Sequence, residues 1–218
     1  MSTEIKSTAN LDVIKEDEIK HLLLPGEVGA ILELTVTDRN GKVTEQRVLK
    51  SKSFVRQFLE LLWIQAFQIP EIAPYSMRDT ANALQDICES GHIFDATAPA
   101  GDITHGPVVG TGNTAPTIND YALETPIAHG VAAGQLQYGA VTFGAPASDA
   151  TTSQFTITRN FANGSGGAIT VNEIGLYGKG YKYVTDYYFM TIRDVIGGGI
   201  LVPNGQTLTV NYRPQAVI

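Results

Sequence analysis

Apolar and polar residues alternate over an early segment of the chain. Leu32, Leu34 and Val36 occupy every second position, with polar residues between them, which is the period of a strand with one buried face. An Asn-Gly pair follows at residues 40–41 and favours a tight turn, because both residue types tolerate positive φ. The pattern therefore predicts a β-hairpin whose return strand runs over residues 42–50.

The period changes to that of a helix after the hairpin. Apolar residues recur at spacings of three and four between Ser53 and Pro70, which predicts one amphipathic helix over residues 53–68 with Ser53 as N-cap and Pro70 as stop signal. Most of its circumference is apolar, a wider stripe than a helix lying on one sheet needs. The helix is therefore expected either to be sandwiched within the fold or to contact another subunit. The candidate contact residues are Phe54, Phe58, Leu61, Leu62, Trp63 and Phe67.

A period of two returns in the second half of the chain. One alternating set contains Phe155, Ile157 and Phe161, and further sets precede and follow it. Clusters of Gly, Asn and Pro, such as residues 163–167 and 203–205, separate these sets. Many short strands joined by such turns predict a mainly β fold, built as an antiparallel β-sandwich or jelly-roll-like domain.

One predicted strand carries its apolar residues on both parities. Ile169 and Val171 occupy one parity, whereas Ile174 and Leu176 occupy the other. A regular strand cannot place both pairs on one face. Either a β-bulge at residues 172–173 shifts the register, or both faces of the strand are covered.

The chain divides into an N-terminal arm and a single β-rich domain. The arm is polar and irregular and ends at a Pro-Gly turn signal. The expected parts are the arm at 1–27 and the domain at 28–218, the latter comprising a hairpin and helix at 28–68, an irregular segment at 69–106 and a sandwich at 107–218. Within the irregular segment, residues 77–87 suit either a strand or a short helix.

Composition and charge narrow the possible functions. The net charge is −7, with 22 acidic and 15 basic residues and no basic cluster, so nucleic-acid binding is disfavoured. No apolar run reaches the roughly 18 residues of a membrane span, and no secretory signal precedes the domain. The single cysteine, Cys88, excludes an internal disulfide. We therefore expect neither nucleic acid nor membrane as a partner.

Candidate catalytic and ligand-binding patterns are weak. The four histidines have no metal-ligand spacing, and no nucleophile with an adjacent base is recognisable. The Gly-Thr-Gly-Asn segment at residues 110–113 lacks the remaining residues of a nucleotide-binding loop and suggests a tight turn. Glu124 and Glu173 stand among apolar residues, where Arg159 or Arg193 would be structural partners. We expect no enzymatic activity, metal or cofactor.

Aromatic residues gather over residues 177–189. Tyrosines beside glycine-rich turns can form a surface for carbohydrate or protein, but aromatic residues are also common in the core of a sandwich. The core is the favoured interpretation for the cluster as a whole. The candidate contact residues within it are Tyr181, Tyr183 and Tyr187.

Several phrases recur in a familiar order along the second half. They are VGTGNTAPT at 109–117, DYALETPI at 120–127, FTITRNF at 155–161, ITVNEIGLY at 169–177, RDVI at 193–196 and VPNGQTLTV at 202–210. This order resembles a widespread group of tailed-bacteriophage virion proteins and, more loosely, the N-terminal attachment domain of phage tail-collar fibre proteins. The resemblance brings no catalytic residues with it.

The resemblance implies a structural role in a virion assembled in the host cytoplasm. The expected function is a tail, neck or adaptor subunit that contacts other virion proteins and forms a homo-oligomer. A capsid decoration protein and a carbohydrate-binding module remain as alternatives. The carbohydrate-binding alternative requires a groove in which aromatic residues of the 177–189 cluster converge with acidic ones.

Overall fold

The computed structural model describes residues 4–8, 22–51, 53–88, 94–182 and 185–218. The predicted arm therefore falls largely outside the described residues. In the described part the protein is mainly β, with antiparallel sheets and one helix, α2 (Arg56–Phe67). This confirms the predicted fold class.

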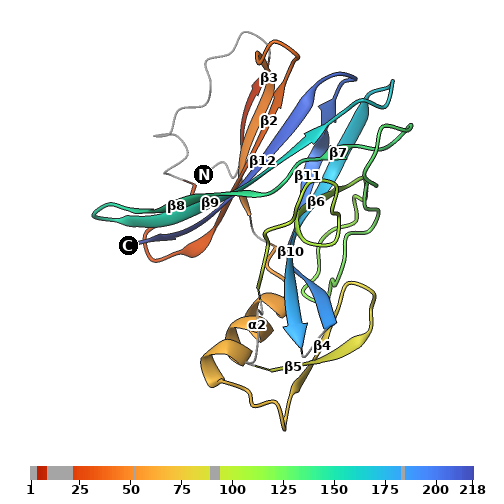
Figure 1. Ribbon diagram of the computed structural model, residues 1–218. Helices are drawn as coiled ribbons and strands as arrows, with labels where there is room; N and C mark the ends of the chain where they lie inside the picture. The colour runs from red at the N-terminus through yellow and green to blue at the C-terminus, as the bar shows by residue number, and fades with distance from the viewer. Residues whose placement is uncertain (1–3, 9–21, 52, 89–93, 183–184) are drawn as a thin grey trace.

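The larger sheet joins strands from both ends of the chain (Figure 1). Its strand order is β1-β3-β2-β12-β9-β7, and β8 pairs with β9 beside β7. The strands are β1 (Glu4–Thr8), β2 (Val28–Thr37), β3 (Val43–Ser51), β7 (Gln137–Tyr138), β8 (Thr142–Ser148), β9 (Thr152–Ala162) and β12 (Thr207–Val217).

The smaller sheet faces the larger one across the main core. Its order is β11-β10-β6, formed by β6 (Gly106–Gly110), β10 (Ile169–Lys182) and β11 (Thr185–Val202). Leu34 and Val210 of the larger sheet share one buried cluster with Ile174 of the smaller sheet. The Tyr212 hydroxyl crosses between the layers and donates to the Ile174 carbonyl at 3.3 Å. The two sheets thus form a sandwich-like arrangement.

The predicted first hairpin is present as β2 and β3, but its turn differs from the expected type. Gly41 adopts a φ of 78°, whereas Asn40 keeps a negative φ. The Asp38 carboxylate accepts hydrogen bonds from the backbone N–H groups of Asn40 and Lys42 at 2.8 and 2.9 Å. An Asx-type side-chain bond therefore holds this turn, rather than positive φ at two successive residues.

Helix α2 begins later than predicted. Residues 53–55 are extended along β11, where the Val55 N–H donates to the Thr191 carbonyl and the Arg193 N–H donates to the Ser53 carbonyl, each at 3.0 Å. Val55 is consequently the N-cap in place of Ser53. The helix ends at Phe67, because Gln68 adopts a left-handed conformation with a φ of 54° before Pro70 is reached.

The segment predicted to be irregular contains a small hairpin. Strands β4 (Tyr75–Arg78) and β5 (Leu84–Ile87) pair with each other, and the Asp79 carboxylate closes their turn by accepting from the N–H groups of Ala81 and Ala83. The hairpin packs against α2 in a second core. This settles residues 77–87 as two strands and their turn.

The mixed parity of β10 arises from a bulge. The register shifts between Val171, which pairs with Ile200, and Glu173, which pairs with Val195. All of Ile169, Val171, Ile174 and Leu176 are buried as a result. The extra residues on β11 include the three glycines at 197–199, which lie within this strand.

Candidate functional site

The inner face of the larger sheet continues past the end of the smaller sheet. Tyr212 pairs with Leu32 and Ile157, and all three are buried beneath the smaller sheet. Further along the same face the cover ends, and Val28 of β2 is 83% exposed. The hairpin formed by β8 and β9 projects beyond the rest of the molecule (Figure 1). Part of the inner, apolar face of the larger sheet is therefore not covered by the smaller sheet.

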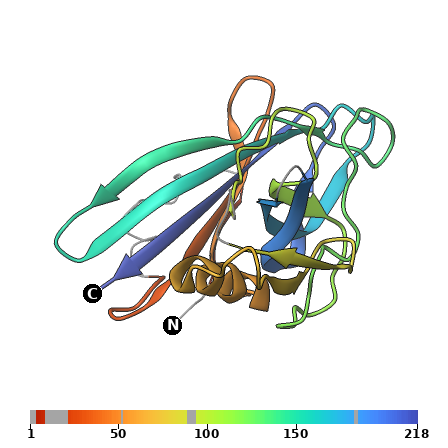
Figure 2. The ribbon, with the colours of Figure 1, turned by 60° about the horizontal axis from the view of Figure 1, so that its bottom comes forward.

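Helix α2 forms the opposite wall of this open region. It lies beside the free ends of β2, β9 and β12 (Figure 2). Between helix and sheet is a cavity of about 740 Å³, whose lining side chains carry no charge. We call it the apolar groove. Its principal residues are Phe54, Phe58, Leu59 and Leu62 from the helix side, and Val28, Phe155, Ile157, Pro214 and Ala216 from the sheet side.

The described residues of the chain cover only one side of α2. Leu61 and Ile64 pack against the β4–β5 hairpin and Phe189. On the other side Leu59 is 63% exposed and Leu62 is 57% exposed. Of the two explanations for the wide apolar stripe, complete enclosure within the fold is thus wrong.

The predicted contact residues fall into three groups. Phe54, Phe58 and Leu62 line the apolar groove, and Trp63 and Phe67 are exposed beside it. Leu61 is only 3% exposed and packs towards the β4–β5 hairpin, so it offers little surface for a contact.

The tyrosine candidates give little support to a second surface. Tyr187 is half-buried against the core beneath α2, while the side chain of Tyr181 and all of Tyr183 lie outside the described residues. Tyr177 and Phe189 are buried, and the Tyr177 hydroxyl accepts from the Leu123 N–H at 2.7 Å. These two aromatic residues belong to the core, as favoured, and line no groove.

A second candidate region is the buried carboxylate of Glu173, at the β10 bulge. Its Oε1 accepts from the N–H groups of Gly112 and Thr125 at 3.1 and 2.8 Å. Its Oε2 accepts from the Glu124 N–H at 3.0 Å and from Arg193 Nε at 2.9 Å. Four donors occupy the acceptor positions of a carboxylate, and the residue has no exposed surface. This carboxylate is therefore committed to holding the fold.

Arg193 extends these contacts to a loop. Its Nη1 donates to Asp120 at 2.7 Å, and its Nη2 donates to the Thr114 hydroxyl at 3.2 Å. The Glu124 carboxylate in turn accepts from the Asn113 and Thr114 N–H groups at 2.9 and 3.0 Å. We call this set the Glu173–Arg193 network. It fastens residues 111–125 to the smaller sheet.

The network shifts the ionisation of its acids. Burial alone would raise the pKa of Asp120, but hydrogen bonds from the Thr117 N–H and from Arg193 outweigh burial and hold that pKa below its usual value. Hydrogen bonds from Thr114 lower the pKa of Glu124 in the same direction. Both acids are therefore ionised in the folded protein at neutral pH.

The two glycines of the Gly-Thr-Gly-Asn segment are explained by this carboxylate. A Cβ at Gly110 would lie 2.5 Å from Oε1 of Glu173, and a Cβ at Gly112 would lie 2.6 Å from the same atom. Only glycine lets the backbone approach so closely. The segment is thus a close approach to a buried side chain, and Gly110 belongs to β6 rather than to a turn.

Arg159 is not a partner of either glutamate, contrary to one of the two pairings considered. It is fully buried and lies over the Tyr138 ring at 4.9 Å. Burial lowers the pKa of its guanidinium to about 10. The guanidinium donates to the backbone carbonyls of Pro99, Asp102, His105, Pro107 and Gly139. It thereby ties the loop before β6 to the larger sheet.

Comparison with protein-family models, curated proteins and solved structures finds no match. Among the described residues there is no group of three or more His, Cys, Asp or Glu side chains placed to hold a metal ion. The only described helix is too short to cross a membrane. The apolar groove is therefore the feature of the described chain that most needs a functional explanation.

Proposed function

We propose that this protein is a structural subunit of a tailed-bacteriophage particle, in its tail or neck, and that it assembles through the apolar groove. The observation that carries the proposal is an uncharged groove of about 740 Å³ between α2 and the overhanging inner face of the larger sheet. Large exposed apolar patches mark contact sites in soluble proteins.

The groove has the chemistry of a contact between proteins. Burial of apolar surface contributes roughly 25 cal/mol per Å², so covering these walls with a partner would be favourable. Contact surfaces are also depleted of charge at their centres, and the same holds for the groove lining.

The walls are held in place before any partner binds. Residues 53–55, just before α2, are hydrogen-bonded to β11, and the covered side of the helix packs on the β4–β5 hairpin. On the sheet side, β12 is paired with neighbours on both edges. A preformed surface loses little conformational freedom on association, which suits a repeated building block.

The particle assignment rests on the order of phrases in the second half of the chain. Residues from three of these phrases, including Gly112, Glu124 and Glu173, meet in the Glu173–Arg193 network. In the network, these residues hold the loop at 111–125 against the smaller sheet of the sandwich. The resemblance thus supports the kind of particle, and the groove supports the mode of assembly.

The first test asks whether the protein is a component of purified particles. Antibodies raised against the chain should detect it in gradient-purified particles of the phage that encodes it, at a constant ratio to the major tail protein. Separate blots of isolated tails and heads should place it with the tails. Its absence from washed particles would overturn the proposal, and its presence on heads alone would replace it with a decoration role.

A matched pair of variants tests the groove itself. Leu62→Glu places a charge in the groove, whereas Val131→Glu makes the same change at an exposed loop residue that does not line it. The first variant should be lost from particles by at least tenfold, and the second should be incorporated normally. Equal incorporation of both folded proteins would remove the groove from the assembly.

A further inference from the structure

The beginning of α2 is capped by a distant loop. A helix leaves its first backbone N–H groups without partners inside the helix, and a side chain at the N-cap position commonly supplies one. Val55 occupies this position and makes no such hydrogen bond. The N–H of Arg56, the first residue of the helix, donates instead to the carbonyl of Ile118 at 3.1 Å. The loop that carries Ile118 therefore takes the place of a capping side chain.

The capping carbonyl lies within a turn that Asp120 closes. The Asp120 N–H donates to the Thr117 carbonyl at 3.1 Å, as in a tight turn over residues 117–120. The Asp120 carboxylate in addition accepts from the Thr117 N–H at 3.0 Å and from the Thr117 hydroxyl at 2.7 Å. Ile118 lies inside this turn, so Asp120 fixes the direction of the carbonyl that caps α2.

Arg193 connects this turn to the smaller sheet. Its side chain is 3% exposed and donates to the Asp120 carboxylate at 2.7 Å and to the buried Glu173 carboxylate at 2.9 Å. The backbone N–H of Arg193 donates to the carbonyl of Ser53, in the segment just before α2, at 3.0 Å. One buried arginine therefore supports the start of α2 by two routes, through Asp120 and through Ser53.

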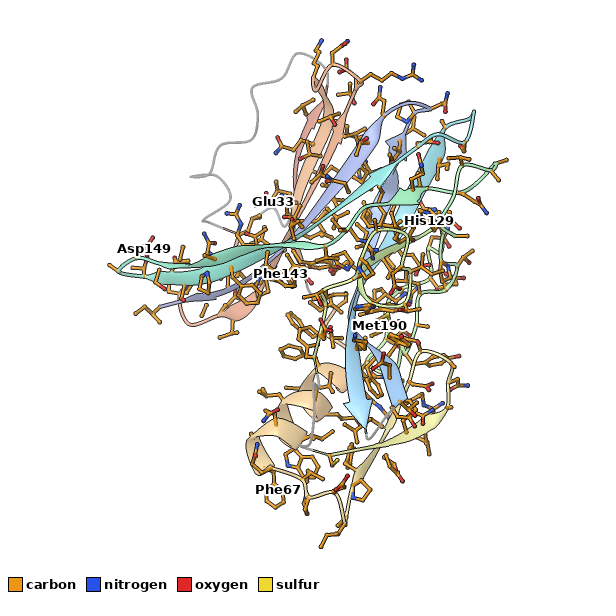
Figure 3. The ribbon with its side chains drawn as sticks, in the orientation of Figure 1. Glu33, Phe67, His129, Phe143, Asp149 and Met190 are labelled. Carbon is orange, nitrogen blue, oxygen red and sulfur yellow. The ribbon has the colours of Figure 1, made fainter. Side chains whose placement is uncertain are left out.

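The far end of α2 projects away from the sandwich. Phe67 points outward, away from both sheets (Figure 3), and is 67% exposed. Leu61 and Ile64 hold one side of the helix against the β4–β5 hairpin and Phe189, whereas Leu62 lines the groove. The angle at which this wall of the groove faces the larger sheet therefore depends on how the beginning of α2 is held.

We propose that Asp120 and Arg193 are positioning residues for the apolar groove. They hold the 117–120 turn, which caps α2 and so fixes the helical wall, although neither residue lines the groove. The inference rests on the proposed function only in its last step, the contact of this wall with another virion protein. The link from Asp120 to α2 is a property of the free chain and can be tested without particles.

Hydrogen exchange of the free protein tests the link. In Asp120→Ala the backbone amides of α2 should exchange about five- to tenfold faster, since loss of a helix cap has an effect of this size. The amides of β12, which is paired on both edges, should keep their rates. Trp63 is the only tryptophan of the chain and lies on α2, so its fluorescence emission should shift as well. Unchanged rates in α2, or equally faster exchange in β12, would overturn the inference.

Two further variants separate positioning from a general loss of stability. Asp120→Asn keeps a side-chain oxygen that can accept from Thr117 and Arg193, so it should restore most of the protection of α2. Asp38→Ala removes a carboxylate that closes the β2–β3 turn by accepting from backbone N–H groups, and it should leave exchange in α2 unchanged. An effect of Asp38→Ala on α2 as large as that of Asp120→Ala would contradict the assignment.

Particle incorporation separates this inference from the proposed function. Asp120→Ala should be incorporated less than the unmodified chain, because the displaced helix alters the groove. Faster exchange in α2 together with normal incorporation would support the positioning role and count against the groove as a contact surface. Unchanged exchange in α2 would overturn the inference, while loss of Leu62→Glu from particles would still support the proposed function.

Discussion

The Glu173–Arg193 network and the apolar groove differ in how far the chain supplies their contacts. In the network, the buried Glu173 carboxylate has a donor at every acceptor position. In the groove, the described residues leave the inner face of a sheet and one side of a helix uncovered. A region satisfied within the chain contributes to stability, whereas a region left unsatisfied indicates what the chain binds.

The comparison also separates recognisable residues from functional ones. The phrases that resemble phage virion proteins contain Gly110, Gly112 and Glu173, which build the interior. The groove is lined by residues such as Val28, Leu62 and Ala216, which belong to no recognisable phrase. Phe155, Ile157 and Leu176 are exceptions, since they stand in two of the phrases and also line the groove. The familiar phrases thus mark mainly the scaffold, and the full set of groove residues has to be read from the tertiary structure.

The largest effect is expected from breaking the network at Arg193. Arg193→Met leaves the charge of Glu173 buried without its cation, which costs about 3–5 kcal/mol for a broken buried pair. Chemical denaturation should show this loss of unfolding free energy. Arg39→Met, at an exposed arginine, should change stability by less than about 0.5 kcal/mol. Equal effects of the two substitutions would show that the network is not a stabilising element.

A smaller loss is expected at the glycine beside the carboxylate. In Gly110→Ala the new methyl group would meet Oε1 of Glu173 at 2.5 Å and the Thr125 carbonyl oxygen at 2.7 Å. Such overpacking costs about 1–3 kcal/mol. At Gly167, by contrast, a Cβ meets nothing within 4 Å, and Gly167→Ala should be close to neutral. The difference between the two thermal midpoints measures the effect.

Acid should loosen the network before it affects the groove. The folded-state pKa values of Asp120 and Glu124 lie below their ordinary values of 3.8 and 4.5. A carboxyl group with a lowered pKa contributes its full stabilisation above its ordinary pKa and loses it as the pH falls through the folded value.

Asp95 should lose stabilisation at low pH in the same way. Its pKa is lowered to about 2, because hydrogen bonds from Thr97 and Lys179 outweigh its burial. The thermal midpoint should therefore fall as the pH drops from about 4.5 towards 2. Arg193→Met should show a shallower fall, since Asp120 has lost its cation. A midpoint that does not change across this range would contradict the assignment of these acids.

The smallest stability effects are expected in the groove. Val28→Glu and Leu62→Glu alter exposed residues on opposite walls, so each should change the unfolding free energy by less than about 0.5 kcal/mol. Both should nevertheless be lost from purified particles by at least tenfold, as measured by blotting. A groove variant that unfolds readily, or a Val28→Glu protein that still assembles, would break the contrast between the two regions.

Residue pattern was sufficient for much of the scaffold. Alternation predicted the β2–β3 hairpin, opposed parities gave a bulge near Glu173 as one of two explanations, and charge complementarity identified Arg193 as one possible partner of Glu173. The hairpin and the bulge depend on local backbone geometry, and the Glu173 pairing involved a choice between only two arginines. The helix start was missed because pairing of residues 53–55 with β11 overrode the N-cap preference of Ser53.

The sequence by itself determined the fold class and the wide apolar stripe of the helix. The need for glycine at residues 110 and 112 became visible only in the tertiary structure, because it depends on the Glu173 carboxylate far along the chain. Only the tertiary structure decided which side of the helix stays open. Leu61 and Leu62 are equally apolar neighbours, yet one is buried and the other is exposed. The apolar pattern shows which side chains avoid water. The position of the groove depends instead on where the smaller sheet ends and where α2 is anchored, and long-range packing determines both.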